Sequence, residues 1–429
     1  MLNPKIKNPT KITQLYPIRL SNVISRIASK VLANRLRYLF PKIISENQSV
    51  FMSECLIIDN VLVAFETMHH IIQKRIGKVG EMAIKLDISK TYDRVEWGCL
   101  EKIMLKMGFH VKWVDIMMRC ICSISYSIKI NGRPWGHITP TQGLHQGDHL
   151  SPYLFFICAE GLLAMLKKAV VDGQIKRVAA CSRGLEISHL FFINDSLIFC
   201  WATREDYSSL ENTLKAYEIA LGQQLNREKT VLFFSSNTPQ DIQDDIKQMF
   251  GLEVIHQHET YLGLPSLIGK SKSNTFQQLN ERLDNKLLGW KEKMLSQARK
   301  MILIKAVIQA IPTYTMSVFK LPNTLCDEMT GMVWKFLWGQ TNEKTKMAWL
   351  SWDKVCTPRE EGGLGFRDFK TFNLALLAKQ GWKLQTNTSS LVYKVLKAKY
   401  FPNSDFLGGR IGILSILCVE EYFGGIEYC

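Results

Sequence analysis

The sequence predicts an α+β fold from three kinds of segment. Residues 81–89 and 189–199 are rich in β-branched and aromatic residues, which favour strands. Residues 151–170 form a long apolar run of helical character, with Pro152 in its first turn. From about residue 270 onward, the apolar residues follow a mainly helical pattern. Strands that alternate with helices, and then give way to helices, are typical of an α+β chain.

Shorter elements complete this pattern between residues 81 and 235. Residues 95–109 predict an amphipathic helix, with Leu100, Ile103, Met104 and Met107 on one face. Residues 125–138 predict a hairpin that turns at Asn131-Gly132. Residues 209–222 predict a helix that ends at Gly222.

The charge balance separates this chain from an average globular protein. Its 429 residues contain 54 Lys and Arg against 39 Asp and Glu, which gives a net charge of +15. A basic surface favours a polyanionic partner, most simply nucleic acid. The eleven Cys form no CxxC pair, so no zinc site is expected. With no apolar signal core at the start, we expect an intracellular protein, nuclear or cytoplasmic, with no membrane association.

The C-terminal part contains a basic helical region and a cluster of tryptophans. The stretch from about 270 to 311 predicts helix that ends at Pro312. Five tryptophans follow, and we expect them in a hydrophobic core: Trp334, Trp338, Trp349, Trp352 and Trp382. Residues 403–429 contain no Lys and four acids, which differs from the basic chain before them.

Three polar segments in the first half are candidates for chemistry. Asp87 ends a strand, Gln146-Gly147 precedes a helix start, and Asn194-Asp195 occupies the tip of an apolar hairpin. Each has an ordinary structural explanation by itself: a surface acid or helix N-cap, a loop before a helix, and a polar turn.

Taken in order, the three segments resemble the palm of a reverse transcriptase. The resemblance is greatest to plant LINE-type (non-LTR) retrotransposons, and the chain looks like a truncated, degenerate copy of one. Supporting segments are SENQSVF with LIIDNVLVAFE (45–66), GQQLNREKT (222–230) and TYLGLP (260–265). The resemblance covers roughly residues 4–402. It implies a right-hand polymerase fold of fingers, palm and thumb, with a ferredoxin-like palm sheet and a mainly helical C-terminal region.

The resemblance also implies a division of the chain. We expect partial fingers at 1–80, and a palm with interleaved finger segments and the primer-grip-like segment at 81–268. A thumb-like helical region follows at 269–322 and a post-thumb region at 323–402. Residues 403–429 are expected to be a degenerate tail.

In this family two Mg²⁺ ions assist attack of a DNA primer on a deoxynucleoside triphosphate, with RNA as the template. The resemblance implies that Asp87, the backbone carbonyl of Ile88, and Asp195 bind metal. Lys229 would meet the leaving pyrophosphate. The expected contacts to nucleotide and primer involve Tyr92, Gln146 and Gly147 on the nucleotide side, and Tyr261, Leu262 and Gly263 in the primer grip.

One catalytic position departs from the family. The hairpin tip reads Phe192-Ile193-Asn194-Asp195, whereas the family places two adjacent aspartates there. An amide oxygen brings no negative charge to Mg²⁺, so Asn194 predicts weakened metal binding and impaired catalysis. Two alternatives stay open: a non-catalytic nucleic-acid-binding remnant, and a translated pseudogene without function.

Overall fold

The chain consists of two compact units, each with its own hydrophobic core. A computed structural model describes residues 2–4, 8, 10–11, 15–17, 22–44, 57–89, 92–130, 132–180, 185–192, 195–251, 260–265, 272–291, 295–339 and 347–404. The first unit comprises Met1–Ile57, His70–Ala179 and Glu186–His256. The second unit comprises Ile58–His69, Ala180–Leu185 and Gln257–Cys429.

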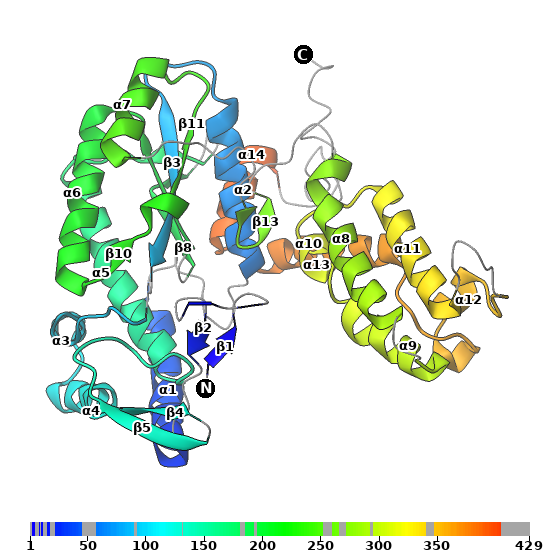
Figure 1. The fold of residues 1–429 in the computed structure, drawn as a ribbon. Coiled ribbons are helices and arrows are strands. Elements are labelled where there is room, and N and C mark those ends of the chain that lie inside the picture. Colours follow the sequence, from blue (N-terminus) through cyan, green and yellow to red (C-terminus); the bar gives the residue numbers. More distant parts are fainter. Residues whose placement is uncertain are drawn as a thin grey trace. The chain divides into compact units, whose positions relative to one another are not determined.

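A five-stranded antiparallel sheet forms the centre of the first unit (Figure 1). Its strands run in the order β10–β3–β9–β8, and β11 also pairs with β3. They are β3 (Glu81–Ser89), β8 (His189–Phe192), β9 (Asp195–Trp201), β10 (Gln224–Leu225) and β11 (Val231–Phe234). The smaller strand pairs are β1 (Leu2–Pro4) with β2 (Leu15–Pro17), β4 (Tyr126–Ile130) with β5 (Arg133–Ile138), and β6 (Val178–Ala179) with β7 (Glu186–Ile187).

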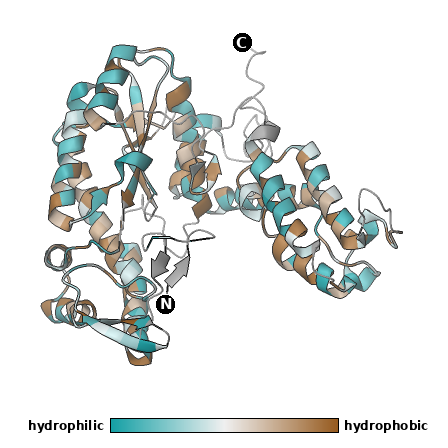
Figure 2. Cartoon of the chain, in the orientation of Figure 1, coloured by the Kyte–Doolittle hydropathy of each residue, from teal (hydrophilic) through white to brown (hydrophobic). Residues whose placement is uncertain are grey.

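The helices of the first unit share one hydrophobic core with a face of this sheet. They are α1 (Val23–Ile43), α3 (Trp97–Lys106), α4 (Val111–Cys122), α5 (Ser151–Val171), α6 (Arg204–Leu221) and α7 (Gln240–Phe250). Helix α2 (Ile57–Gln73) crosses from one unit into the other. Helix α6 carries both hydrophilic and hydrophobic residues (Figure 2), and its buried Tyr207, Leu210 and Leu214 recur at the helical period.

The alternation of side chains along β3 decides which face of the sheet carries the polar groups. Met82, Ile84 and Leu86 belong to the same core cluster as buried residues of α5 and α6. Because successive side chains of a strand point to opposite faces, Lys85 and Asp87 lie on the other face. Near the C-terminal end of β3, Asp87 therefore lies on the face of the sheet opposite α5 and α6.

Most elements predicted for this unit are confirmed. The strand at 81–89, the hairpin at 126–138 and the helix that begins at Ser151 are all present. Helix α6 ends at Gly222, whose φ of 68° lies in the left-handed region. A Cβ at Gly222 would also lie 2.8 Å from the carbonyl oxygen of Arg94, so this cap requires glycine on both grounds.

The second unit is mainly helical around one small hairpin. Its strands are β12 (Thr260–Tyr261) and β13 (Leu264–Pro265). The helices are α8 (Lys272–Lys291), α9 (Gln297–Leu303), the π-helical turn η3 (Ile304–Ile308), α10 (Thr313–Met316), α11 (Asn323–Trp338), α12 (Trp352–Cys356), the 3₁₀ turn η4 (Arg359–Glu361), α13 (Phe369–Thr386) and α14 (Leu391–Tyr400). No helix within the described ranges combines the length and apolarity needed to traverse a lipid bilayer.

The prediction of a helical stretch that ends at Pro312 is confirmed at its end and wrong in its continuity. Helix α8 ends at Lys291, and α9 starts afresh after Ser296, whose extended backbone makes it an N-cap. Helical structure then ends at Ile308, residues 309–312 form turns, and the new helix α10 begins directly after Pro312. A proline at the start of a helix costs no hydrogen bond, because the first N–H groups of a helix have no partner within it. A proline in the sequence can therefore mark the start of one helix as well as the end of another.

The prediction that all five tryptophans are core residues is wrong for two of them. Trp334, Trp338 and Trp352 are partly buried and pack against the second core. Trp349 and Trp382, in contrast, are largely exposed. Clustering in the sequence does not bury an aromatic residue, because each position on a helix faces a different direction.

Candidate carboxylate site

The ends of β3 and β9 bring two predicted metal ligands face to face. In the antiparallel register of these strands, Asp87 lies directly opposite Asp195. Opposite residues of such a pair project to the same face, with Cβ atoms about 4.5–5.5 Å apart. Both side chains are partly buried. The sheet therefore aligns two carboxylates that are more than a hundred residues apart in the chain.

The hairpin that carries Asp195 has a two-residue turn. Phe192 and Asp195 are paired, so Ile193 and Asn194 form the connection between β8 and β9. Ile193 and Asn194 themselves lie outside the described residues. The prediction for Asn194 therefore falls outside the described residues.

Lys229, from a third segment of the chain, lies beside the carboxylate of Asp87. Lys229 Nζ lies 3.7 Å from Oδ2 of Asp87, and the lysine side chain is otherwise largely exposed. Lys229 ends the 3₁₀ turn η2 (Arg227–Lys229), which follows β10 at the edge of the sheet. The sequence resemblance singled out Lys229, and the fold places its ammonium group beside Asp87.

Asn226 is a site residue that the sequence reasoning missed. Its backbone N–H donates to the carbonyl oxygen of Asp87 at 2.8 Å. Its side-chain Nδ2 donates to Oδ2 of the same residue at 3.4 Å. Both contacts fix the strand end from which the carboxylate projects. An asparagine three residues before the predicted lysine was the available signal.

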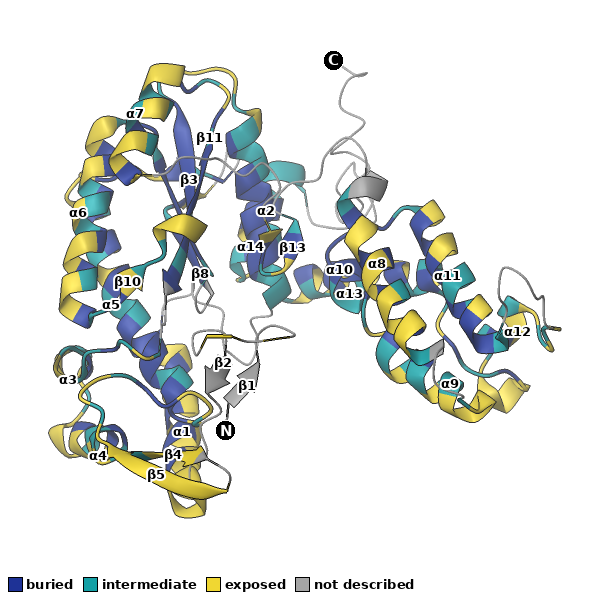
Figure 3. Ribbon diagram, in the orientation of Figure 1, coloured by how far each residue is buried: buried dark blue, intermediate teal, exposed yellow. Residues whose placement is uncertain are grey.

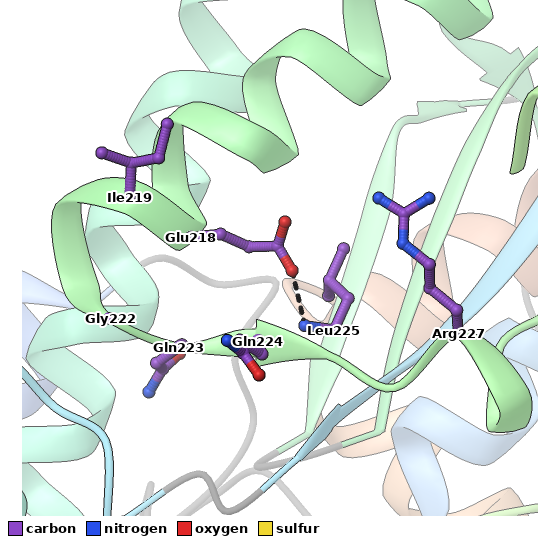
Figure 4. A pocket seen from close by; sticks show the side chains of 7 residues that line it. All are labelled: Glu218, Ile219, Gly222, Gln223, Gln224, Leu225 and Arg227. Atoms are coloured by element: carbon purple, nitrogen blue, oxygen red, sulfur yellow. Dashed lines mark hydrogen bonds between the residues drawn. The ribbon is translucent and has the colours of Figure 1, made fainter.

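The segment before Asn226 is held by helix α6 (Figure 4). Glu218 accepts a hydrogen bond from the backbone N–H of Leu225 at 2.7 Å. The residues around this contact line an open pocket of about 490 Å³: Glu218, Ile219, Gly222, Gln223, Gln224, Leu225 and Arg227. None of the predicted catalytic residues lines this pocket. The hydrogen bond between Glu218 and Leu225 instead positions the chain that leads to Lys229.

Backbone hydrogen bonds join the segment around Tyr92 to the residues just before Gln146 and Gly147. Leu144 N–H donates to the carbonyl oxygen of Tyr92 at 2.6 Å, and Gly143 N–H donates to that of Val95 at 2.8 Å. A Cβ at Gly143 would lie 2.6 Å from the carbonyl oxygen of Asp93, so only glycine permits this approach. The loop that carries Gln146 and Gly147 is thereby anchored next to Tyr92.

Tyr92 itself is packed against the core. Its ring lies 5.4 Å from that of Phe155, and burial raises the pKa of its phenol. Gln146 and Gly147 are exposed. Gly147 has a φ of 92°, yet a Cβ built on it would meet nothing within 4 Å. Its backbone conformation, and not crowding by the protein, is the reason for glycine here, which leaves the loop open to a ligand.

The predicted primer-grip residues form the turn of β12–β13. Leu262 and Gly263 both have positive φ, 52° and 76°, as in a type I′ turn. The hydroxyl of Tyr314 donates to the carbonyl oxygen of Leu262 at 3.1 Å, which holds the turn against α10. Tyr261 is buried. These residues belong to the second unit, whereas Asp87 and Asp195 belong to the first.

The donor set fits a hard divalent cation in part. Carboxylate oxygens are the ligands that Mg²⁺ prefers, and Asp87 and Asp195 supply them from adjacent strands. Ile88, whose carbonyl was predicted to assist, pairs with Leu225 in β10. Within the described residues, no group of three or more His, Cys, Asp or Glu side chains would hold a metal ion. The third position of the predicted set is Asn194.

Comparison with known proteins identifies the family. Residues 6–266 match the family described as reverse transcriptase (RNA-dependent DNA polymerase). The chain is 40% identical over 137 residues to a putative ribonuclease H protein of Arabidopsis thaliana, which covers 32% of this chain and 22% of that protein. It is 29% identical over 161 residues to a Pol polyprotein from the type-1 retrotransposable element R2 of Popillia japonica, covering 38% of this chain and 25% of that protein.

The chain thus spans a quarter or less of the length of these two relatives. Among solved structures, telomerase of Candida albicans in complex with a fragment of telomeric RNA is similar over 88% of this chain and 55% of that chain. The identity is 12% and the TM-score 0.42, so this likeness adds nothing to the family match.

Proposed function

Since the chain belongs to the reverse transcriptase (RNA-dependent DNA polymerase) family and has its right-hand polymerase fold, we propose that it is the RNA-directed DNA polymerase domain of a plant LINE-type retrotransposon. The observation that carries this proposal is the register of β3 and β9, which sets Asp87 opposite Asp195. Two carboxylates aligned at adjacent strand ends suit divalent-metal chemistry on a phosphate substrate.

The proposed reaction joins a primer 3′-oxygen to the α-phosphorus of a deoxynucleoside triphosphate and releases pyrophosphate. When bound, two Mg²⁺ ions would supply Lewis-acid assistance to the attacking and leaving oxygens. Asp87 and Asp195 would hold the ions, with the carbonyl of Ile88 as a further ligand. Lys229 would then turn from Asp87 to the leaving pyrophosphate, which its exposed side chain permits.

The remaining roles concern orientation of the substrates. Tyr92, packed on Phe155, would form the floor under the sugar and exclude a ribose 2′-hydroxyl. The open loop of Gln146 and Gly147 would face the nucleotide and the RNA template. Tyr261, Leu262 and Gly263 would contact the DNA primer. These assignments follow the family resemblance, and the anchoring of the loop at Tyr92 supports the first two.

We further propose that Asn194 impairs catalysis in this chain. The site would have two carboxylates where the family has three, and the amide of Asn194 contributes no charge to the metal ions. A loss of several kcal/mol of transition-state stabilisation corresponds to a rate roughly a thousandfold lower, because each ~1.4 kcal/mol is tenfold.

Primer extension on an RNA template with Mg²⁺ or Mn²⁺ tests both proposals. We expect Asn194→Asp to extend the primer about a thousandfold faster than the natural chain. The control is Asn194→Asp combined with Asp195→Asn, which should lose that gain. Rapid synthesis by the natural chain would refute the impairment. If neither protein synthesises DNA while both bind an RNA–DNA hybrid in a salt-dependent manner, the basic chain is a binding remnant and not a polymerase.

A further inference from the structure

The hairpin β4–β5 is an unusual feature of the first unit. Its two strands form a separate two-stranded sheet within the described part of the chain. Every residue of β5 is exposed (Figure 3). A two-stranded hairpin of this kind is marginally stable in water unless something packs against it. The sequence thus maintains a strand pair whose own fold buries little of it.

One face of this hairpin is apolar and exposed. Ile128 is paired with Trp135, and Tyr126 with Ile138, so each pair projects to the same side. A register shift between Tyr126 and Ile128 brings Ile138 onto the side of Trp135, although these two residues are three positions apart. Trp135 is 61% exposed, and Ile128 and Ile138 are each nearly half exposed. An exposed tryptophan between two isoleucines is costly in water and suggests a binding surface.

The charge around this face selects the partner. No acidic residue occurs between Asp115 and Asp148. Arg133 is exposed and projects to the same face as Trp135, whereas the exposed Lys129 projects to the other face. An aromatic side chain beside a cation, without acids, suits a single-stranded nucleic acid, whose bases stack and whose phosphates are negative. A protein could also bind the apolar face, but the charges of this stretch do not favour a protein over a nucleic acid.

The same face leads toward the candidate site. The ring of Tyr126 stacks on that of His145, with 5.8 Å between centroids and 28° between planes. His145 directly precedes Gln146 and Gly147, the open loop proposed to face the nucleotide and template. The apolar face of the hairpin is therefore continuous, through Tyr126 and His145, with the template side of the proposed site.

We propose that this face binds the unpaired RNA template, with Trp135 stacked on a base and Arg133 against the phosphate backbone. The inference rests on the proposed polymerase function and adds a template-holding surface to it. Stacking on an aromatic side chain is tolerant of sequence, as a template contact must be.

A binding experiment tests this surface without requiring catalysis. The probes are a fluorescent RNA–DNA hybrid with blunt ends and the same hybrid with a single-stranded 5′ RNA extension, compared by anisotropy at several salt concentrations. We expect Trp135→Ala to weaken binding of the extended hybrid about tenfold, and that of the blunt hybrid by less than about twofold. Trp135→Tyr should restore most of the affinity, because its ring still stacks.

The matched control is Trp382→Ala, because Trp382 is 67% exposed on α13 and should change neither affinity. Arg133→Ala should reduce the slope of log affinity against log salt concentration by about one on the extended hybrid. Equal loss on both probes, or no loss on either, would overturn the proposal. A change in oligomeric state with unchanged RNA binding would instead assign the patch to a protein contact.

Failure of the hairpin and failure of the polymerase proposal give different results. If Asn194→Asp extends primers and Trp135→Ala binds the extended hybrid normally, the template surface is refuted while the polymerase stands. If Trp135→Ala shows the selective loss and Asn194→Asp makes no DNA, the hairpin binds RNA in a protein that does not polymerise.

Discussion

Two carboxylates, the buried Glu66 in the second unit and the partly buried Asp87 in the first, have opposite surroundings. In the second unit, Glu66 on α2 is almost fully buried, and both of its carboxylate oxygens have partners. Lys399 Nζ lies 2.7 Å from Oε2, and the hydroxyl of Tyr400 donates to both oxygens at 3.1 and 3.2 Å. In the first unit, Asp87 faces a second acid, Asp195, and its cation Lys229 lies at 3.7 Å with an exposed side chain.

This difference fits a structural role for Glu66 and the metal-binding role proposed for Asp87. Burial raises the pKa of Glu66, whereas Lys399 and Tyr400 oppose that rise, so the local partners offset part of the cost of the buried charge. Like charges directly opposite in a sheet destabilise it. The first unit keeps such a pair at two strand ends, where Lys229 lies beside Asp87 and a bound divalent cation would reduce the repulsion further.

The largest effect is expected where the first unit loses one of its paired acids. In the Asn194→Asp background, Asp87→Asn should reduce primer extension by about a thousandfold or more, because a direct metal ligand loses its charge. Steady-state extension on an RNA template is the measurement. Its control is Asp172→Asn at the exposed end of α5, which should leave the rate unchanged. A drop of less than about tenfold would exclude Asp87 from the metal site.

In the second unit, the corresponding change should affect stability and not chemistry. Lys399→Met leaves the carboxylate of Glu66 buried without its cation, and we expect it to lower the free energy of unfolding by about 3 kcal/mol. Urea denaturation is the measurement. The double variant with Glu66→Gln should recover part of this loss, because no charge then remains buried. An unchanged midpoint for Lys399→Met would show that Tyr400 alone satisfies Glu66.

The control for Lys399 is Lys370→Met. It breaks the pair with Asp327 at 2.7 Å, but both of those side chains are well exposed. Exposed pairs contribute little because water and salt screen them, so this variant should unfold as the natural chain does.

Local pattern was sufficient to predict most of the first unit. The strand at 81–89 and the hairpin at 189–199 followed from runs of β-branched and aromatic residues, and two-residue spacing fixed their turn. The opposition of Asp87 and Asp195 needed one further step, the family resemblance, because no local signal specifies which strands pair.

Contacts between distant segments were not predictable in the same way. Glu66 and Lys399 are separated by 333 positions, and neither residue type announces its partner. Asn226 was missed because its contacts are to the backbone and side chain of Asp87, which only the paired strands bring near. Apolar character alone does not predict burial either, because Ile302 on α9 is largely exposed.

The buried His189 gives the first unit a pH-dependent stability. Burial, together with Lys167 and Arg177, lowers the pKa of His189 from 6.5 to about 3. A depressed pKa means that the unfolded chain binds the proton first, so stability is present above pH 6.5 and is lost as pH falls toward 3. Between about pH 7 and about pH 5, His189 should cost about 2 kcal/mol.

The measurement is urea denaturation of the natural chain and of His189→Gln at both pH values. Glutamine cannot take up the proton, so the stability of this variant should fall by about 2 kcal/mol less than that of the natural chain. Parallel falls in the two proteins would mean that His189 is protonated in the folded state.

The smallest effect on stability is expected at the open loop of Gln146 and Gly147 in the first unit. A substitution there distinguishes a ligand site from a packed turn. Gly147→Ala should cost about 1 kcal/mol, because alanine tolerates a φ of 92° poorly but its Cβ meets no neighbour. Gly143→Ala adds to the same strain a contact of 2.6 Å with the carbonyl oxygen of Asp93, so it should cost distinctly more in urea denaturation. In the Asn194→Asp background, Gly147→Ala should nevertheless raise the KM for the nucleotide, because its methyl group occupies space that the protein leaves open. An unchanged KM would mean that the loop is open to solvent only.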